Sequence, residues 1–314
     1  MAFQTGTASS FINLLDALRL FATANGWTQN QWSAVGADQW LSLQKGSIYA
    51  NLLASTTQIQ MKGALGYSGA AAWNAQLSTH TYAPKVRDGW YGAVAWPVTY
   101  WFFQHTAPDS IEVVIRYQPT RFQYLQIGTI TKYGTWPGGE YYAASSEHPA
   151  VGIDGAAIMA TQVPNSNSNF PALFWAKGGE LSYLAVPELL HCEIDSQVWG
   201  GPVTAFASGA PAPNLGILIR ASNHLYPLPQ RSNSAFNGLT TLQPIELYAL
   251  RPDAHHSPLG RVEHVRYAIV TNHNAADIID IGGQKWMLFP WVEKGGPTDA
   301  GGQHYGMAIK YDGP

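Results

Sequence analysis

An apolar stripe near the start of the chain is its clearest periodic feature. Large apolar side chains recur there at three- and four-residue spacing, at Phe11, Leu14, Leu15, Leu18 and Phe21. This is the period of one face of an α-helix. Ser10 can cap the first turn, and Asn25 followed by Gly26 can end the helix. We predict an N-terminal helix that packs on its own domain; an exposed stripe would instead make it an assembly arm.

The middle of the chain alternates as a β-hairpin does. From Ile111 to Tyr117 the odd positions are β-branched or aromatic and the even positions are mostly polar, which predicts a half-buried strand. After a turn at Pro119 and Thr120, residues 122–129 carry large side chains on both faces, so neighbours should cover both faces of this second strand. Glycines and a proline then gather around aromatics in 133–139, which predicts a loop.

Shorter alternating segments, typical of strands, occur along the rest of the chain, in residues 48–61, 98–103, 242–250, 262–269 and 277–290. In the last segment, Gly282 and Gly283 separate two apolar runs and predict a tight hairpin turn. Residues 185–198 fit either a short helix or a strand, and residues 63–75 fit a loop or a small helix.

Many short strands with one clear helix predict a mainly β fold, with sandwich or jelly-roll-like domains, a short N-terminal helix and long loops. Residues 147–171 and 202–213 are rich in Pro, Asn, Ser and Gly and should be surface loops. The predicted divisions are a helix packed on the body, a β domain with the central hairpin, a loop-rich insertion and a C-terminal β-hairpin segment, at 1–30, 31–150, 151–240 and 241–314. One continuous domain is the alternative.

The composition is poor in charge and rich in aromatic rings. Only 12% of the 314 residues are charged, about half the usual share, and there are 12 Trp and 16 Tyr. Exposed apolar patches mark interfaces, and Trp and Tyr anchor them. The composition therefore favours a surface covered by other subunits over the alternative, an ordinary enzyme with a Gly/Ser/Thr/Asn-rich surface.

The net charge and the cysteine count limit the partners and the compartment. A net charge of −3 gives no general attraction to nucleic acid, so no nucleic-acid partner is expected. The single cysteine, Cys192, excludes an intramolecular disulfide, so the chain either matures in a reducing compartment, which fits cytoplasmic assembly, or does without bridges. The first ten residues do not resemble a secretory signal, and no apolar run approaches eighteen residues, so we expect a soluble chain without membrane insertion.

No metal, cofactor or nucleophile site is predicted. His191, Cys192 and Glu193 are consecutive, so in a strand only the first and third side chains can converge. His255, His256 and His264 also lack the spacing of a known metal motif, and ordinary hydrogen-bonded histidines are the expectation. Neither a nucleophile elbow nor a phosphate-binding glycine loop is present, and the Gly-Gly pairs look like turns. We assign no catalytic residue.

Two kinds of glycan chemistry are the alternatives to a structural role. Cleavage needs two carboxylates across a cleft, and Glu140 is the best single candidate, with Asp154, Asp109 or Asp88 as its partner. The simpler interpretation of Glu140 is a loop carboxylate that caps backbone amides. Binding without cleavage needs aromatic faces for sugar rings, which can come from Trp90, Tyr91, Trp136, Tyr141 and Tyr142.

Several aromatic and glycine landmarks occur together in this chain. A YWF segment lies in Val98–Phe103, and the strand pair and the loop continue to Ser145. The C-terminal part contains Trp286-Met287-Leu288-Phe289-Pro290-Trp291 and Tyr305-Gly306-Met307-Ala308-Ile309-Lys310-Tyr311. With these motifs the chain resembles a family of structural proteins from tailed bacteriophages. The family's N-G-R-R segment before the first strand is replaced by residues 104–110, so the contacts of those basic residues do not carry over.

The resemblance implies a virion structural protein, and we expect it in the tail tip or baseplate, packed against other tail proteins and against copies of itself in a symmetric assembly. A host surface glycan is the alternative partner. We expect two contact regions, the 133–142 loop and the 286–291 segment, with Tyr133, Trp136, Tyr141, Tyr142, Trp286, Phe289 and Trp291 as the interface residues. The C-terminal strand is expected to extend a sheet, with a neighbour's sheet edge as one option.

Overall fold

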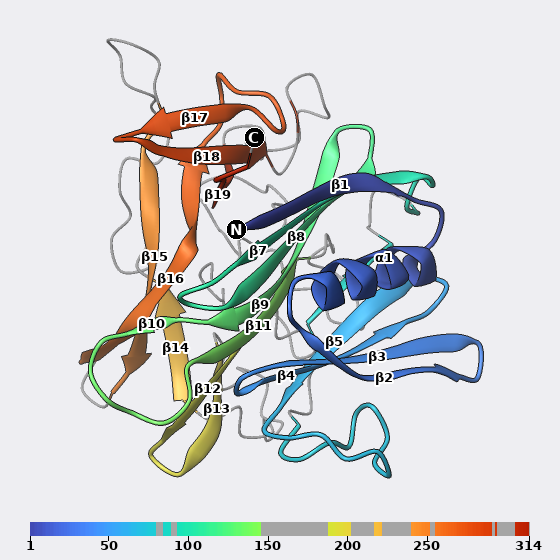
Figure 1. Cartoon of the computed structure of the whole chain (residues 1–314). Helices are drawn as coiled ribbons and strands as arrows, with labels where there is room; N and C mark the ends of the chain where they lie inside the picture. Colours follow the sequence, from blue (N-terminus) through green and yellow to red (C-terminus); the bar gives the residue numbers. More distant parts are fainter. Residues whose placement is uncertain are drawn as a thin grey trace, which may run out of the picture.

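The computed structural model describes residues 1–79, 84–88, 93–145, 188–201, 217–221, 240–251, 255–290, 293 and 305–313. Within these residues the protein is mainly β, with antiparallel sheets packed as a sandwich and one helix near the N-terminus (Figure 1). The predicted fold class is confirmed.

The helix α1 (Phe11–Ala24) forms as its apolar period requires. The Ser10 hydroxyl accepts a 3.1 Å hydrogen bond from the amide of Asn13, and Gly26 follows the helix with φ +81°, a conformation that glycine adopts without strain. The apolar stripe is buried in the chain's own core. The predicted packing on its own domain is therefore confirmed, and the assembly arm is not.

A five-stranded antiparallel sheet lies beside this helix. Its order is β2-β3-β4-β5-β6, with bounds Thr28–Val35, Asp38–Lys45, Ile48–Ala54, Gln58–Ala64 and Lys85–Arg87. The predicted strand segment 48–61 is thus two strands joined by a turn, and residues 65–79 form a loop. Side chains alternate between an inner face and an outer face, as in any strand.

A larger sheet contains the other strands. Its order is β1-β7-β8-β9-β11-β12-β13-β14-β15-β16-β19-β18-β17, and β10 (Thr131–Lys132) pairs with β16. The first half of this order comprises β1 (Ala2–Ala8), β7 (Val98–His105), β8 (Ser110–Gln118), β9 (Arg121–Thr129), β11 (Glu140–Ser145), β12 (Glu188–Ile194) and β13 (Gln197–Gly201). The second half comprises β14 (Ile217–Ala221), β15 (Leu242–Leu250), β16 (His256–Ile269), β17 (Ile278–Ile281), β18 (Gln284–Pro290) and β19 (Tyr305–Lys310).

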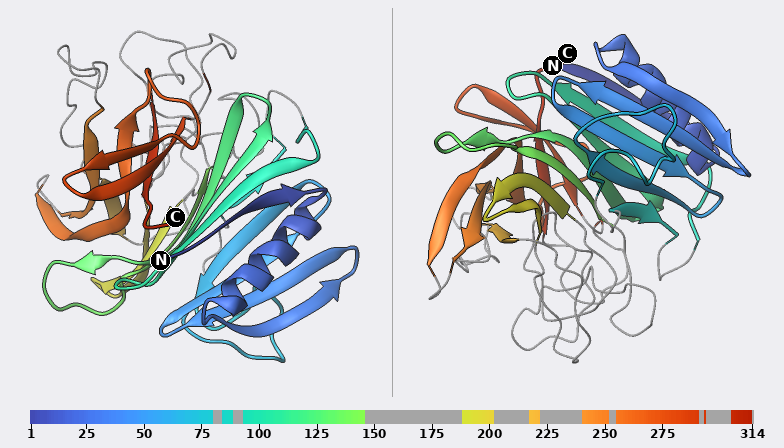
Figure 2. Two further views of the ribbon diagram at one scale, coloured as in Figure 1. Left: turned by 45° about the horizontal axis from the view of Figure 1, so that its top comes forward. Right: turned by 90° about the horizontal axis from the view of Figure 1, so that it is seen from below.

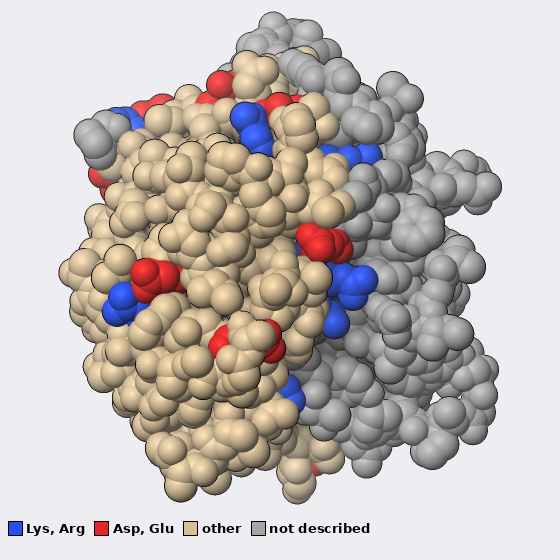
Figure 3. Space-filling view, turned by 90° about the vertical axis from the view of Figure 1, so that its right-hand side faces the viewer, with Lys and Arg blue, Asp and Glu red and all other residues tan. Residues whose placement is uncertain are grey.

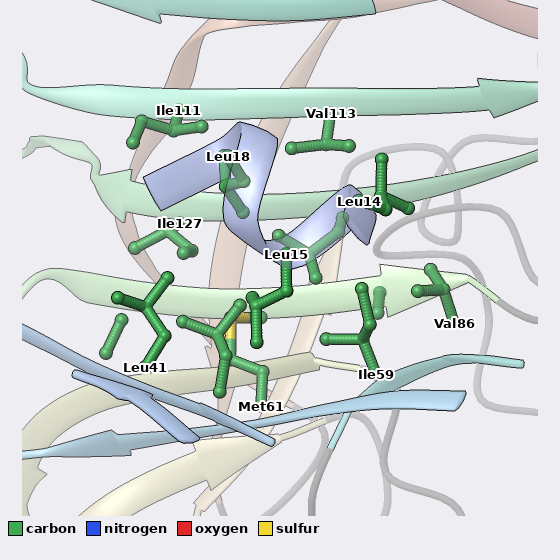
Figure 4. Packing of buried hydrophobic residues seen from close by; sticks show 14 of the residues in the cluster. Leu14, Leu15, Leu18, Leu41, Ile59, Met61, Val86, Ile111, Val113 and Ile127 are labelled. Atoms are coloured by element: carbon green, nitrogen blue, oxygen red, sulfur yellow. The ribbon is translucent and has the colours of Figure 1, made fainter. Parts of the chain in front are cut away.

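The strands around the central hairpin are covered on both sides. One face packs on α1 and the five-stranded sheet, and the opposite face packs on β14, β15, β16, β18 and β19 (Figures 1 and 2). Figure 4 shows the first core, where Leu14, Leu15 and Leu18 of α1 face strand residues. The predicted two-sided burial of residues 122–129 is confirmed. The half-buried strand predicted for residues 111–117 is wrong, because even Glu112 is fully buried.

Three remaining predictions about strands are settled by the pairing. Residues 188–198 form no helix but the strand β12, a turn at Asp195 and Ser196, and the start of β13. Strands β17 and β18 form the predicted hairpin, with Gly282 and Gly283 at positive φ in its turn. The C-terminal strand β19 lies between β16 and β18 of its own chain, so the option of a neighbour's sheet edge is wrong. The predicted surface loops at 147–171 and 202–213 lie outside the described residues.

Candidate functional site

Four polar side chains meet where the large sheet contacts the five-stranded sheet. Strands β11 and β12 are antiparallel with Tyr141 opposite Leu190, which places Glu140 beside His191. The Glu140 carboxylate lies 2.6 Å from His191 Nδ1 and accepts a second hydrogen bond from the Ser47 hydroxyl. Glu193 lies 3.3 Å from His191 Nε2. We refer to Ser47, Glu140, His191 and Glu193 as the Glu140 cluster.

The local backbone explains how these side chains come together. The β12–β13 pairing is irregular between His191 and Ile194, and Glu193 has φ +39° within that irregularity. This conformation is costly for a residue with a side chain. On the other side, Gly138 has φ +89°, and a Cβ on it would lie 2.3 Å from the carbonyl oxygen of His191. Only glycine fits, and the Gly139 amide then donates to that carbonyl at 2.8 Å.

The environment shifts the pKa values of the central pair in opposite directions. Burial acts to raise the pKa of Glu140, but hydrogen bonds from His191 and Ser47 outweigh it, so the pKa lies below its ordinary value of 4.5. Burial acts to lower the pKa of His191, but the hydrogen bond and charge of Glu140, and then those of Glu193, outweigh it, so the pKa lies above 6.5. Between pH 4.5 and 6.5 the pair is therefore a carboxylate facing an imidazolium.

We expect the Glu140 cluster to stabilise the fold in a pH-dependent way. The stabilisation from Glu140 is present above its unfolded pKa and is lost as the pH falls through its lower folded value. The stabilisation from His191 is complete below its unfolded pKa and is lost as the pH rises through its higher folded value. The melting temperature of the wild type should therefore exceed that of Glu140→Gln most between pH 4.5 and 6.5.

Thermal unfolding measured from pH 3 to 9 checks this expectation. Glu193→Gln is the matched control, because the Glu193 carboxylate is more exposed and forms the longer contact to His191. That variant should stay closer to the wild type at every pH. A difference between the wild type and Glu140→Gln that does not vary with pH would contradict the assignment of an ion pair.

The geometry of the cluster does not suit glycan cleavage by Glu140. A general acid needs a raised pKa and an open path to the substrate, whereas the pKa of Glu140 is lowered and its carboxylate is held by His191 and Ser47. Among the predicted partners, Asp109 pairs with Lys45 at 3.1 Å and Asp88 accepts from the Val94 amide at 2.9 Å. Asp154 lies outside the described residues. The imidazole of His191 fills the space between the two glutamates.

The contacts of Ser47 and Cys192 also differ from those of an activated nucleophile. A catalytic serine is hydrogen-bonded to a base such as an imidazole. The Ser47 hydroxyl instead donates its hydrogen bond to the Glu140 carboxylate. Cys192 faces the other core, and burial raises the pKa of its thiol to about 11. His191 and Glu193 do converge, but within the described residues no three His, Cys, Asp or Glu side chains are placed to hold a metal ion.

A second buried polar group joins the two halves of the large sheet. His105 Nδ1 lies 2.9 Å from Glu112, and the ring of His105 stacks on that of His264 with 4.2 Å between centroids and 12° between planes. His264 Nε2 contacts the carbonyl oxygen of Pro108 at 3.1 Å. Burial, and then the neighbouring His105, lower the pKa of His264. We refer to His105, Glu112 and His264 as the histidine stack.

Sequence reasoning missed this group. His264 was considered with His255 and His256, both of which are exposed, whereas its true neighbours are on β7 and β8. The available signal was Glu112, a carboxylate beside the apolar residues of β8, which the alternating pattern assigns to a solvent face.

The predicted interface residues divide into buried and accessible ones. Tyr141, Tyr142, Trp286 and Phe289 lie in the interior of the chain, so the prediction that they contact other subunits is wrong for these four. Their aromatic and apolar surface is covered by the chain's own sheets, and for the same reason Tyr141 and Tyr142 cannot stack on a sugar. Trp291 lies outside the described residues, as do Trp90 and Tyr91.

Two residues of the loop remain accessible. The side chain of Tyr133 is 40% exposed, and its hydroxyl donates to Glu246 at 3.1 Å. Trp136 is half-buried, with its indole N–H donating to the carbonyl of Leu259 at 3.2 Å and the Lys132 ammonium 5.2 Å from its ring. Both stay predicted interface residues.

Comparison of the chain with known protein families and with curated proteins gave no match. The resemblance to phage structural proteins therefore depends on the sequence motifs. In the part of the chain that the structure covers, no helix is long and apolar enough to cross a membrane. The fold and the two polar groups together define the molecule as a layered β protein with buried polar groups that connect strands from distant parts of the chain.

Proposed function

We propose that this protein is a structural component of a tailed-phage virion, in the tail tip or baseplate, and that it acts through subunit packing. It folds in the host cytoplasm and ends in the virion. The observation that carries the proposal is the character of its sheet edges. Strands β1 and β2 end their sheets and contain neither a charged residue nor proline. Soluble proteins that work alone usually protect such edges with Lys, Pro or short strands.

The accessible surface supports the same role. At the other end of the large sheet, Ile278 and Ile281 of β17 are exposed. Figure 3 shows one face of the molecule, on which charged side chains are few and scattered. A surface with few charges and open strand edges fits contact with other protein subunits. The aromatic richness carries less weight than the composition suggested, because much of it lies in the chain's own two cores.

Mass spectrometry of purified particles tests the proposal. The chain should be found in particles released by host lysis, at a fixed ratio to other tail proteins, and antibodies against it should label the tail. Particles that lack the chain would overturn the proposal.

The two glycan alternatives predict different results. The purified chain should not clear a suspension of peptidoglycan, and Glu140→Gln should behave as the wild type in that assay, because Glu140 is held in an ion pair. Clearing that is lost in Glu140→Gln would establish a hydrolase. If the purified chain binds lipopolysaccharide without cleaving it, and the other tail proteins of the particle do not bind it, the chain would be established as an adhesin.

A further inference from the structure

Among the described residues, β2 is the longest terminal strand of a sheet that contains neither a charged residue nor proline. β2 is the terminal strand of the five-stranded sheet, and its sequence TQNQWSAV is uncharged over eight residues. The N–H and C=O groups on its outer side have no strand partner in the described part of the chain. Such a row of backbone groups is a template for another strand.

The C-terminal part of β2 is held in shape from both faces. Gln31–Val35 pairs residue by residue with Asp38–Ser42, after one extra residue at Asn30. On the helix side, the Arg19 guanidinium lies 4.9 Å from the Trp32 ring. On the outer face, the Tyr67 hydroxyl donates to Gln31 at 2.9 Å. A strand fixed in this way loses little conformational entropy when a partner pairs with it.

The other edges are less suited to pairing. The start of β1 is flanked by the C-terminal residues, because the Phe3 ring lies 5.1 Å from that of Tyr311 and Asp312 approaches Met1. Strand β6 has only three residues, two of which are Lys85 and Arg87. Strand β17 has only four residues, and one of them is the charged Asp280.

We infer that two copies of this chain pair antiparallel through their β2 edges, so that the two five-stranded sheets form one sheet across a two-fold axis. In this arrangement each β2 residue lies opposite a β2 residue of the other copy. Because β2 is uncharged, no like charges meet across the pair. A charged partner would find no counter-charge on β2. Leu20, which is 53% exposed on the helix beside β2, and Val35 at the end of the strand add apolar surface on either side.

This inference rests on the proposed assembly role and specifies the contact that the role uses. Light scattering after size exclusion should give the wild-type chain a mass about twice its 34.2 kDa. Ala34→Lys places two exposed lysines near the axis and should weaken the dimer more than about ten-fold. Thr56→Lys, at the exposed turn between β4 and β5, is the matched control and should leave the dimer unchanged. Circular dichroism should show both variants folded.

Cysteine cross-linking tests the contact independently of affinity. Neighbouring Cα atoms on antiparallel strands are about 4.5–5.5 Å apart, within the range that a disulfide spans. The native Cys192 is buried, so a cysteine introduced at Gln31, Ser33 or Ala34 is the only accessible thiol among the described residues. Under mild oxidation at least one of these variants should give a covalent dimer, and Thr56→Cys should not.

Two results would overturn the inference: a wild-type chain that is monomeric at high micromolar concentration, or a dimer that Ala34→Lys leaves intact and that none of the three cysteine variants captures. Neither result affects the proposed virion role, because detection of the chain in particles is a separate measurement. If the chain is not found in particles but forms the dimer in solution, the virion role is rejected and the β2 contact is retained.

Discussion

Replacing Glu112 by alanine is expected to lower the free energy of unfolding by about 3–5 kcal/mol. Glu112 is fully buried and is the partner of His105 Nδ1 at 2.9 Å. Its removal leaves a buried imidazole nitrogen without a partner and creates a cavity between the two halves of the large sheet. Chemical denaturation monitored by tryptophan fluorescence measures the loss as a shift of the transition midpoint.

A conservative variant separates the polar contact from the packing. Glu112→Gln retains the shape of the side chain and an oxygen that can accept from His105, so its loss should be much smaller, on the order of 1 kcal/mol. Equal losses in Glu112→Ala and Glu112→Gln would show that the charge of the carboxylate, and not the filled space, is what the histidine stack needs. A negligible loss in both would contradict the buried contact itself.

Phe289→Ala is expected to destabilise the isolated chain by about 3–5 kcal/mol. The Phe289 side chain is fully buried in the second core, where its ring lies 5.2 Å from that of Trp101 and 6.0 Å from that of Phe103. Its truncation removes these contacts and leaves a cavity in the core between the two halves of the large sheet, which close packing does not easily fill. The same denaturation experiment measures the effect.

This prediction distinguishes core from interface at a residue where the motif suggested an interface. If Phe289 contacted another subunit, its truncation would weaken assembly and leave the stability of the monomer nearly unchanged. Ile281→Ser is the control, because Ile281 is 44% exposed at the end of β17, and its effect on monomer stability should stay within about 0.5 kcal/mol. Equal stability of the two variants would contradict the burial of Phe289.

The two polar groups differ in what they contribute to the molecule. The Glu140 cluster joins the turn after β3 to the large sheet, and nearby Lys45 and Asp109 add an ion pair at 3.1 Å between the same two parts. The histidine stack joins β7 and β8 to β16. The Glu140 cluster therefore connects the two sheets, whereas the histidine stack connects two halves of the large sheet.

The candidate site could be anticipated only in part. Glu140, His191 and Glu193 were all recognised as potentially reactive side chains, but they were assigned to two different chemistries. Their convergence depends on the pairing of β11 with β12 and on the irregularity at Glu193, and neither leaves a periodic mark in the sequence. The role of Ser47, which lies 93 positions before Glu140, had no local signal at all.

The sequence by itself determined the local elements of this protein. The helix Phe11–Ala24, the central hairpin and the glycine turn of β17 and β18 follow from periods, caps and turn residues that act over a few positions. Only the tertiary structure decided which faces are covered. Whether Glu112 or Phe289 is buried depends on sheet order, because the layers that cover them come from distant parts of the chain. A period of two records that a strand has two faces, but it does not record how many sheets pack against them.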